Sequence, residues 1–466
     1  MKAMGIFGGV QVLGIVCSIV RTKLVALWIG SVGVGLFGLF NNALDMLNTA
    51  TNLGIRSSSV RDISQAAESG DRTLMARIVA VVRRWSLWLG LGGALLTLAL
   101  APVLSRFTFG DDTHIWGFVA LSTAVLFMAI TSGEQAILQG SQLLKRLASS
   151  TLWGTLCGLA ISIPMFYWLR ERSVVPSIIV YAACNAIAAW LLRNKEFPAI
   201  AMTARETAAM GSGFVRLGIY MTLGNFATIL AAYVFNAWLN HEAGTSEVGF
   251  YQAGYTLVNK YTGLLFTALG MEYYPRLARV AEHRTRMRIF VSQEVNVAMM
   301  VLAPIAVLFI LLREQVVWLL YTSEFHVILS YVAWGMVGMV LRALSWCMAF
   351  VILARGDGMI YVITEVLSAI ATVVLNIVCY HVWGLTGLGI AFLLSYAFYA
   401  AMIAIVYVWH YRLSMSAGSL VSTVWALGAT LGALTLMEKH LAMPTAVLAA
   451  ITITVTLWQA RALWRR

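Results

Sequence analysis

The chain has 466 residues, of which 60% are hydrophobic and 11% are charged, and its mean hydropathy is +0.82. A soluble domain cannot hide that much apolar surface, so the composition excludes a soluble globular protein and indicates a polytopic membrane protein. The net charge of +12 would suggest nucleic acid as the partner of a soluble protein, but the cytoplasmic loops of membrane proteins also collect Lys and Arg. We therefore expect membrane lipids as partners and no nucleic acid.

Windows of about 20 apolar residues predict fourteen transmembrane helices and no sheet, so the predicted fold class is an all-α polytopic membrane protein. In chain order, the predicted helices cover residues 5–29, 33–55, 79–101, 115–138, 148–169, 174–192, 214–239, 248–271, 290–312, 328–353, 359–380, 385–409, 417–437 and 443–463.

The distribution of basic residues predicts the orientation of these helices. With the N-terminus placed in the cytoplasm, the cytoplasmic segments hold 23 Lys and Arg residues, whereas the opposite segments hold five. Both termini are therefore expected to be cytoplasmic, because Lys and Arg are enriched on that side. Four basic residues remain inside predicted helices, namely Arg21, Lys23, Lys260 and Arg342.

Two pairs of segments indicate an internal repeat. The segment "VGLFGLFNNALD" from Val34 aligns with "VGFYQAGYTLVN" from Val248 at an offset of 214, and "ILQGSQLLKRLASSTLWG" from Ile137 aligns with "ILARGDGMIYVITEVLSA" from Ile352 at an offset of 215. Nearly equal offsets in the same order predict the duplication of a six-helix unit, as in transporters built from parallel repeats. The predicted parts are an N-terminal lobe at 1–195, a C-terminal lobe at 196–412 and an additional helix pair at 413–466.

Polar side chains line one face of the second predicted helix. They follow i, i+4, i+7, i+11 spacing, which places them on one side of a helix; they are Asn41, Asp45, Asn48 and Asn52. The aligned helix of the second half has Gln252, Thr256 and Asn259 at the same phase. Such a face either joins helices through hydrogen bonds or lines a wet cavity. Its recurrence in both halves favours the cavity.

The embedded cations raise the same choice between structure and function. Lys23 lies near the outer end of its helix, where a lysine can extend its ammonium group to the interface. The other three cations lie deeper, so structural ion pairs are the main alternative to a substrate role. The candidate acids are Asp45, Glu134 and Glu365, which could pair with the cations, relay protons, or do both. The excess of cations favours an anionic companion such as a phosphate or pyrophosphate head group, whose oxygens suit the planar donors of arginine.

Motifs for nucleotide or metal chemistry are absent or misleading. Gly33-Val-Gly35-Leu-Phe-Gly38 matches GxGxxG formally, but no strand is predicted before it. The glycines are better interpreted as allowing close helix packing. The sequence contains no P-loop and no HExxH motif, so we expect no cofactor and no metal.

Several longer segments resemble one known superfamily. They are "KLVALWIGSVGVGLFG" at 23–38, "EVGFYQAGYTLVNKY" at 247–261, "YYPRLARV" at 273–280, "LLYTSEF" at 319–325, "VLRALSWCMAFVILARGD" at 340–357 and "GLTGLGIAF" at 384–392. In these segments the chain resembles the polysaccharide transporter branch of the multidrug/oligosaccharidyl-lipid/polysaccharide (MOP) flippase superfamily, especially bacterial translocases for O-antigen units and for the lipid-linked trisaccharide of enterobacterial common antigen.

The resemblance implies two pseudo-symmetric six-helix bundles that form a V and open alternately to each side of the bacterial inner membrane. It also implies that the substrate is an undecaprenyl-pyrophosphate-linked oligosaccharide, and that cations at the positions of Lys23 and Arg342 contact the pyrophosphate. The last two helices resemble those of flippases for peptidoglycan precursors. Polysaccharide polymerases and chain-length machinery are candidate protein partners.

The functional hypothesis is therefore a flippase for O-antigen, enterobacterial common antigen or a related surface polysaccharide, and not an enzyme. It moves the substrate from the cytoplasmic to the periplasmic leaflet. The expected substrate-binding residues are Arg21, Lys23, Asn41, Asn48, Asn52, Gln252, Asn259, Lys260 and Arg342, and the candidate coupling or ion-pair acids are Asp45, Glu134 and Glu365. The alternatives are a cation-coupled multidrug exporter of the same superfamily, a membrane-embedded glycan polymerase or ligase, and an inactive scaffold.

Overall fold

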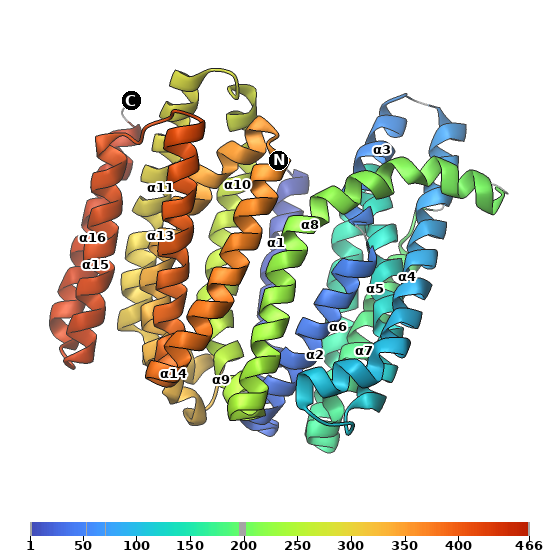
Figure 1. The fold of residues 1–466 in the computed structure, drawn as a ribbon, viewed down its shortest axis with the longest axis horizontal. Helices are drawn as coiled ribbons and strands as arrows, with labels where there is room; N and C mark the ends of the chain where they lie inside the picture. The colour runs from blue at the N-terminus through green and yellow to red at the C-terminus, as the bar shows by residue number, and fades with distance from the viewer. Residues whose placement is uncertain (1, 53, 70, 195–201, 465–466) are drawn as a thin grey trace. The chain divides into compact units, whose positions relative to one another are not determined.

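A computed structural model describes residues 2–52, 54–69, 71–194 and 202–464. Over these ranges the chain is helical and contains no strand, which confirms the predicted all-α fold (Figure 1). The α-helices are α1 Lys2–Trp28, α2 Gly30–Asn52, α3 Ile55–Ser69, α4 Arg72–Phe109, α5 Ile115–Gly140, α6 Leu144–Leu169, α7 Val174–Leu191, α8 Ala204–Ala243, α9 Thr245–Tyr255, α10 Tyr261–Arg279, α11 Arg284–Leu311, α12 Arg313–Leu320, α13 Leu329–Arg355, α14 Gly358–Ile405, α15 Ala417–Glu438 and α16 Ala442–Trp464.

Every one of the fourteen predicted spans overlaps a helix in the described ranges. Eight stretches of these ranges are long and apolar enough to cross a membrane, and two of them, Leu144–Leu191 and Gly358–His410, each contain two predicted spans. Inside α14 the predicted boundary falls at Gly384, whose φ of 57° and ψ of −140° interrupt the helix. Glycine adopts this backbone conformation at little steric cost, so the chain changes direction there.

None of the predicted spans covers helix α3. Its side chains are mostly polar, but one face is apolar, and Ile63 and Ala66 are almost fully buried. They pack against α4 and α5 in a cluster that includes Val79, Val82 and Ile137. A short helix with one apolar face falls below the length of a spanning segment, which explains why a search for 20-residue apolar windows misses it.

Helices α4 and α8 extend well beyond the predicted spans because they have strong N-terminal caps. The Asp71 carboxylate accepts hydrogen bonds from the backbone N–H groups of Thr73 and Leu74 at the start of α4. Thr203 and Glu206 form a capping box at the start of α8. Both arrangements satisfy backbone donors that a helix start otherwise leaves unpaired, so each helix begins among polar residues before its apolar segment.

The chain divides into two compact units, Met1–Gly249 and Phe250–Arg466. In the first unit α2 packs against α4, α5 and α8, and α1 packs against α6. In the second unit α13 packs against α14, and the last two helices, α15 and α16, pack against α11 (Figure 1). The predicted lobes at 1–195 and 196–412 and the appended pair at 413–466 stay predictions, because they derive from a sequence repeat rather than from packing.

Within the first unit, α2 and the start of α9 touch through a pair of glycines. A Cβ atom at Gly35 would lie 2.0 Å from the carbonyl oxygen of Thr245, and a Cβ atom at Gly249 would lie 2.0 Å from the carbonyl oxygen of Ser31. No side chain fits at such distances, so the two backbones meet directly. The packing role expected for the glycines of the GxGxxG match is therefore found at Gly35.

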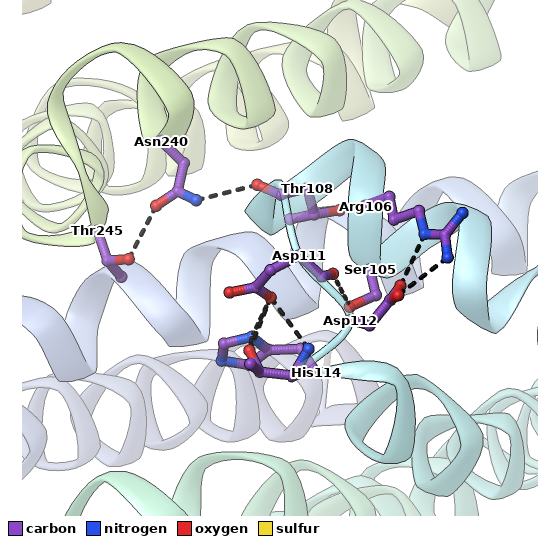
Figure 2. Close-up of polar contacts among 9 residues, drawn as sticks. Ser105, Arg106, Thr108, Asp111, Asp112, His114, Asn240 and Thr245 are labelled. Atoms are coloured by element: carbon purple, nitrogen blue, oxygen red, sulfur yellow. Dashed lines mark hydrogen bonds and ion pairs between the residues drawn. The ribbon is translucent and has the colours of Figure 1, made fainter.

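The turn between α4 and α5 is fastened to the end of α8, as Figure 2 shows. Asn240 on α8 donates a hydrogen bond of 3.0 Å from Nδ2 to the carbonyl oxygen of Thr108. The Oδ1 atom of Asn240 accepts a 2.8 Å hydrogen bond from the hydroxyl of Thr245. In the turn itself, the Asp111 carboxylate accepts hydrogen bonds from the backbone N–H and the hydroxyl of Thr113, which lower the pKa of that carboxyl.

Candidate functional site

Arg21, embedded in α1, is held by aromatic rings of the first unit. Its guanidinium carbon lies 5.8 Å from the ring centroid of Phe37 on α2 and 5.2 Å from that of Tyr181 on α7. The ion pairs found among the described residues do not include Arg21. A cation that contacts the faces of aromatic rings keeps its N–H donors available for oxygen acceptors, because a ring face interacts with its charge and does not occupy those donors.

The position of Tyr181 is fixed by its neighbours on α6 and α7. A Cβ atom at Gly158 would lie 2.8 Å from Cδ2 of Tyr181, so the ring packs directly against the α6 backbone. Its hydroxyl lies 3.3 Å from Oγ1 of Thr155. On α7, Asn185 donates a 2.8 Å hydrogen bond to the carbonyl oxygen of Tyr181. The ring beside Arg21 is therefore held in place by α6.

Arg342, embedded in α13, has a similar environment in the second unit. Its guanidinium carbon lies 5.2 Å from the ring centroid of Phe266 on α10 and 5.6 Å from that of Tyr396 on α14. Its Nη1 donates a short hydrogen bond to Oδ1 of Asn259. The amide nitrogen of Asn259 is buried and has no hydrogen-bond partner among the described residues. Arg342 and Asn259 together thus have N–H groups that could donate hydrogen bonds to the oxygen atoms of a ligand.

Asn259 lies in a π-helical turn, Thr256–Lys260, between α9 and α10. π-turns are rare and are often found at functional sites, because they shift one side chain out of the regular helical phase. The predicted polar face of Gln252, Thr256 and Asn259 runs into this turn. The prediction for Lys260 concerns a side chain outside those that the structure describes.

On α2 the predicted polar face shows few links to other helices. Asn41 donates a 2.7 Å hydrogen bond to the carbonyl oxygen of Phe37, within its own helix. The Oδ1 atoms of Asn48 and Asn52 are buried without a hydrogen-bond partner in the described ranges. Buried amide oxygens normally have a partner, so water or a ligand group is expected at these positions. This arrangement favours the wet-cavity interpretation over hydrogen bonding between helices.

The three candidate acids differ in their surroundings. Glu134 on α5 forms an ion pair with Arg83 on α4, with N–O distances of 2.7 and 3.1 Å, and Arg83 also donates to the carbonyl oxygen of Asn194. Glu365 accepts a 2.8 Å hydrogen bond from the hydroxyl of Tyr399. Asp45 has an accessible side chain. Glu134 is thus one of the ion-pair acids, whereas Asp45 has no ion pair within the described part of the chain.

Sequence reasoning identified the embedded arginines but not the rings around them. No spacing distinguishes these rings from the other aromatic residues, which make up 11% of the chain; they belong to Phe37, Tyr181, Phe266 and Tyr396.

Lys23, the other predicted cation of the first helix, is half-buried on α1. No group of three or more His, Cys, Asp or Glu side chains that could hold a metal ion occurs among the described residues.

Comparison with known proteins places these features in a family. A family model described as polysaccharide biosynthesis protein matches residues 35–330, which is more than half of the chain. The Lipid III flippase of Escherichia coli (strain K12) is 23% identical over 360 residues, which cover 74% of this chain and 82% of that protein. The Lipid III flippase of Shigella flexneri matches with the same identity and coverage.

Solved structures show the same fold. A structure of the Lipid II flippase MurJ in an inward closed conformation is similar with a TM-score of 0.74 and 9% identity, and the match covers 99% of both chains. An inward-facing multidrug resistance MATE family transporter of the MOP superfamily is similar with a TM-score of 0.68 and 14% identity, over 90% of this chain and 95% of that one. The resemblance seen in the sequence is confirmed: the chain belongs to the polysaccharide biosynthesis protein family and has the fold of the MOP superfamily.

Proposed function

We propose that this protein is a flippase that moves an undecaprenyl-pyrophosphate-linked oligosaccharide from the cytoplasmic to the periplasmic leaflet of the bacterial inner membrane. The observation that carries the proposal is the environment of Arg21 and Arg342. Each is embedded in an apolar helix and lies against two aromatic rings, and neither forms an ion pair with a described residue. The similarity to Lipid III flippases supports this class of substrate.

The physical argument rests on the cost of a charge in a bilayer. An isolated arginine at the centre of a membrane helix is expensive, and a cavity that admits water and an anion reduces this cost. A pyrophosphate offers several oxygens in the geometry that a guanidinium recognises, and arginine stays charged at all physiological pH values. Translocation then needs no bond to be made or broken: the head group crosses beside the cations while the prenyl tail remains in lipid. The protein is accordingly proposed not to be an enzyme.

Transport against a gradient requires a source of energy. Asp45 and Glu365 are the proposed coupling acids, since Glu134 is already paired with Arg83. The basic cytoplasmic segments support an orientation with both termini in the cytoplasm. Polymerases and chain-length proteins of surface polysaccharide assembly are proposed as partners on the periplasmic side.

The test is leaflet transfer in proteoliposomes that contain an undecaprenyl-pyrophosphate oligosaccharide, with an imposed proton gradient. Arg21→Gln and Arg342→Gln remove one embedded charge each. Arg106→Gln is the matched control, because Arg106 is 69% exposed and pairs with Asp112 at a surface turn (Figure 2).

We expect each embedded substitution to lower the transfer rate at least tenfold, whereas the control transfers at the rate of the unmodified protein. Unfolding temperatures in detergent check that all variants are folded. Unchanged transfer by the double variant Arg21→Gln/Arg342→Gln would exclude a head-group role for these arginines. Export of cationic drugs by the unmodified protein, without lipid transfer, would favour the multidrug exporter instead.

A further inference from the structure

Tyr255 is an exposed aromatic residue next to the Arg342 site. It is the last residue of α9 and directly precedes the π-turn that contains Asn259. Its side chain is 40% exposed, yet it lies close enough to Arg342 and Tyr396 for electrostatic interaction with both. A phenol that faced lipid would leave its hydroxyl without a partner, whereas a phenol beside an embedded cation can face a polar space.

The Tyr255 ring has a rigid base. Its centroid lies 5.8 Å from that of Tyr251, and Tyr251 stacks on Tyr331 with a centroid distance of 6.0 Å and an interplanar angle of 22°. Tyr251 and Tyr331 are buried, with exposed fractions of 7% and 1%. Tyr331 in turn packs on the α9 backbone, because a Cβ atom at Gly254 would lie 2.1 Å from its ring. The three tyrosines thus form a ladder that begins in the core and ends at an accessible ring.

Such a ring offers a pyranose the contacts it needs. One face of a pyranose consists of C–H groups, which are attracted to the negative face of an aromatic ring, while the sugar hydroxyls need donors and acceptors. The Tyr255 hydroxyl and the unpartnered amide nitrogen of Asn259 can supply them. In a lipid-linked oligosaccharide the first sugar is bonded directly to the pyrophosphate. A pyrophosphate on Arg342 would therefore bring that sugar next to Tyr255.

We propose that Tyr255, supported by Tyr251 and adjoined by Tyr396, is the stacking platform for the sugar at the reducing end of the lipid-linked oligosaccharide. This assignment rests on the proposed function, and it adds a sugar-recognition subsite to the pyrophosphate site. It divides recognition of the head group into two parts: Arg342 binds the anion that all such lipids share, and Tyr255 binds the glycan.

The division can be measured with two probes. Binding of an undecaprenyl-pyrophosphate oligosaccharide and of sugar-free undecaprenyl pyrophosphate is determined for the purified protein in detergent. We expect Tyr255→Leu to weaken binding of the glycan-linked lipid about tenfold and to leave binding of the sugar-free lipid unchanged. Tyr255→Phe keeps the ring and loses only the hydroxyl, so it should weaken binding of the glycan-linked lipid less than Tyr255→Leu does and leave binding of the sugar-free lipid unchanged. Arg342→Gln should weaken binding of both.

Tyr274→Leu is the matched control, because Tyr274 is 41% exposed on α10 and packs beside Phe350, so it should bind both lipids normally. An equal loss for both lipids in Tyr255→Leu would show a structural role and overturn the platform. Equal affinity of the unmodified protein for the two lipids would overturn the platform and leave the flippase proposal standing. Failure of the unmodified protein to bind either lipid would overturn the flippase proposal and the platform with it.

Discussion

The ion pair between Glu134 and Arg83 allows a test of whether Glu134 stabilises the fold or couples transport to protons. Glu134 is 6% exposed and accepts two hydrogen bonds from Arg83, which is 28% exposed. Removing one member of a buried pair leaves an uncompensated charge, which typically costs 3–5 kcal/mol. Because Arg83 retains some access to solvent, which screens its charge, we expect Glu134→Gln to cost about 2–3 kcal/mol of unfolding free energy. The double variant Arg83→Met/Glu134→Met removes both charges and should lie within about 1 kcal/mol of the unmodified protein.

The assay is unfolding by SDS titration in mixed micelles, applied to Arg83→Met, Glu134→Met and the double variant as a double-mutant cycle, with Glu134→Gln measured beside them. The control is Asp112→Asn, which breaks an exposed pair and should leave the midpoint unchanged. Transport is measured alongside: a structural pair predicts that the double variant regains transport, whereas a coupling acid predicts that it stays inactive. Glu134→Gln with unchanged stability, or a double variant as unstable as Glu134→Gln, would refute the reasoning.

Three further predictions concern packing and pH. Gly35→Ala places a Cβ atom 2.0 Å from a backbone carbonyl oxygen of α9, so it should destabilise the fold by about 2 kcal/mol or more, whereas Gly14→Ala, with no atom within 4 Å, should leave the unfolding temperature the same or higher. Asn240→Ala removes both hydrogen bonds of a side chain that is 9% exposed, and a loss of about 1–3 kcal/mol is expected in SDS titration. Hydrogen bonds from Thr113 lower the pKa of Asp111, so its contribution to stability is present above the unfolded-state pKa near 4 and is lost as pH falls through the lower folded-state value. The stability difference between the unmodified protein and Asp111→Asn should therefore shrink between pH 6 and pH 3, and a constant difference would contradict this assignment.

Much of the fold could be predicted because the bilayer imposes a simple rule. A helix must stay apolar for about 20 residues to cross, and each of the fourteen spans predicted by this rule overlaps a helix. The rule found neither α3 (Ile55–Ser69) nor α12 (Arg313–Leu320), which are too short or too polar to satisfy it. It also placed the start of α4 too late, because the cap at Asp71 stabilises a polar first turn that hydropathy does not register.

The site was less accessible to sequence reasoning. Arg21 and Arg342 are charged residues within apolar runs, so their positions in the sequence were enough to predict them as site residues. Their environment depends on residues far away in the chain: Tyr181 is 160 residues from Arg21 along the chain, and no local pattern connects them. For the same reason, the sequence presented Glu134 as both a coupling candidate and a structural one. Only the fold places Arg83 beside it.

The glycine contact between α2 and α9 bears on the origin of the chain. At the offset of 214 that aligns the two predicted repeats, Ser31 corresponds to Thr245 and Gly35 corresponds to Gly249. The approach of Gly35 to Thr245 is therefore the same contact as the approach of Gly249 to Ser31, with the partners exchanged. Contacts of this kind occur where two identical subunits meet about a two-fold axis. If the halves arose by duplication, the ancestral six-helix protein was equipped to pair with itself, and a single glycine then served both sides of a homodimer. In that case, fusion of the two copies allowed Gly35 and Gly249 to mutate independently. A side chain at either position would still collide with the backbone of the opposite helix.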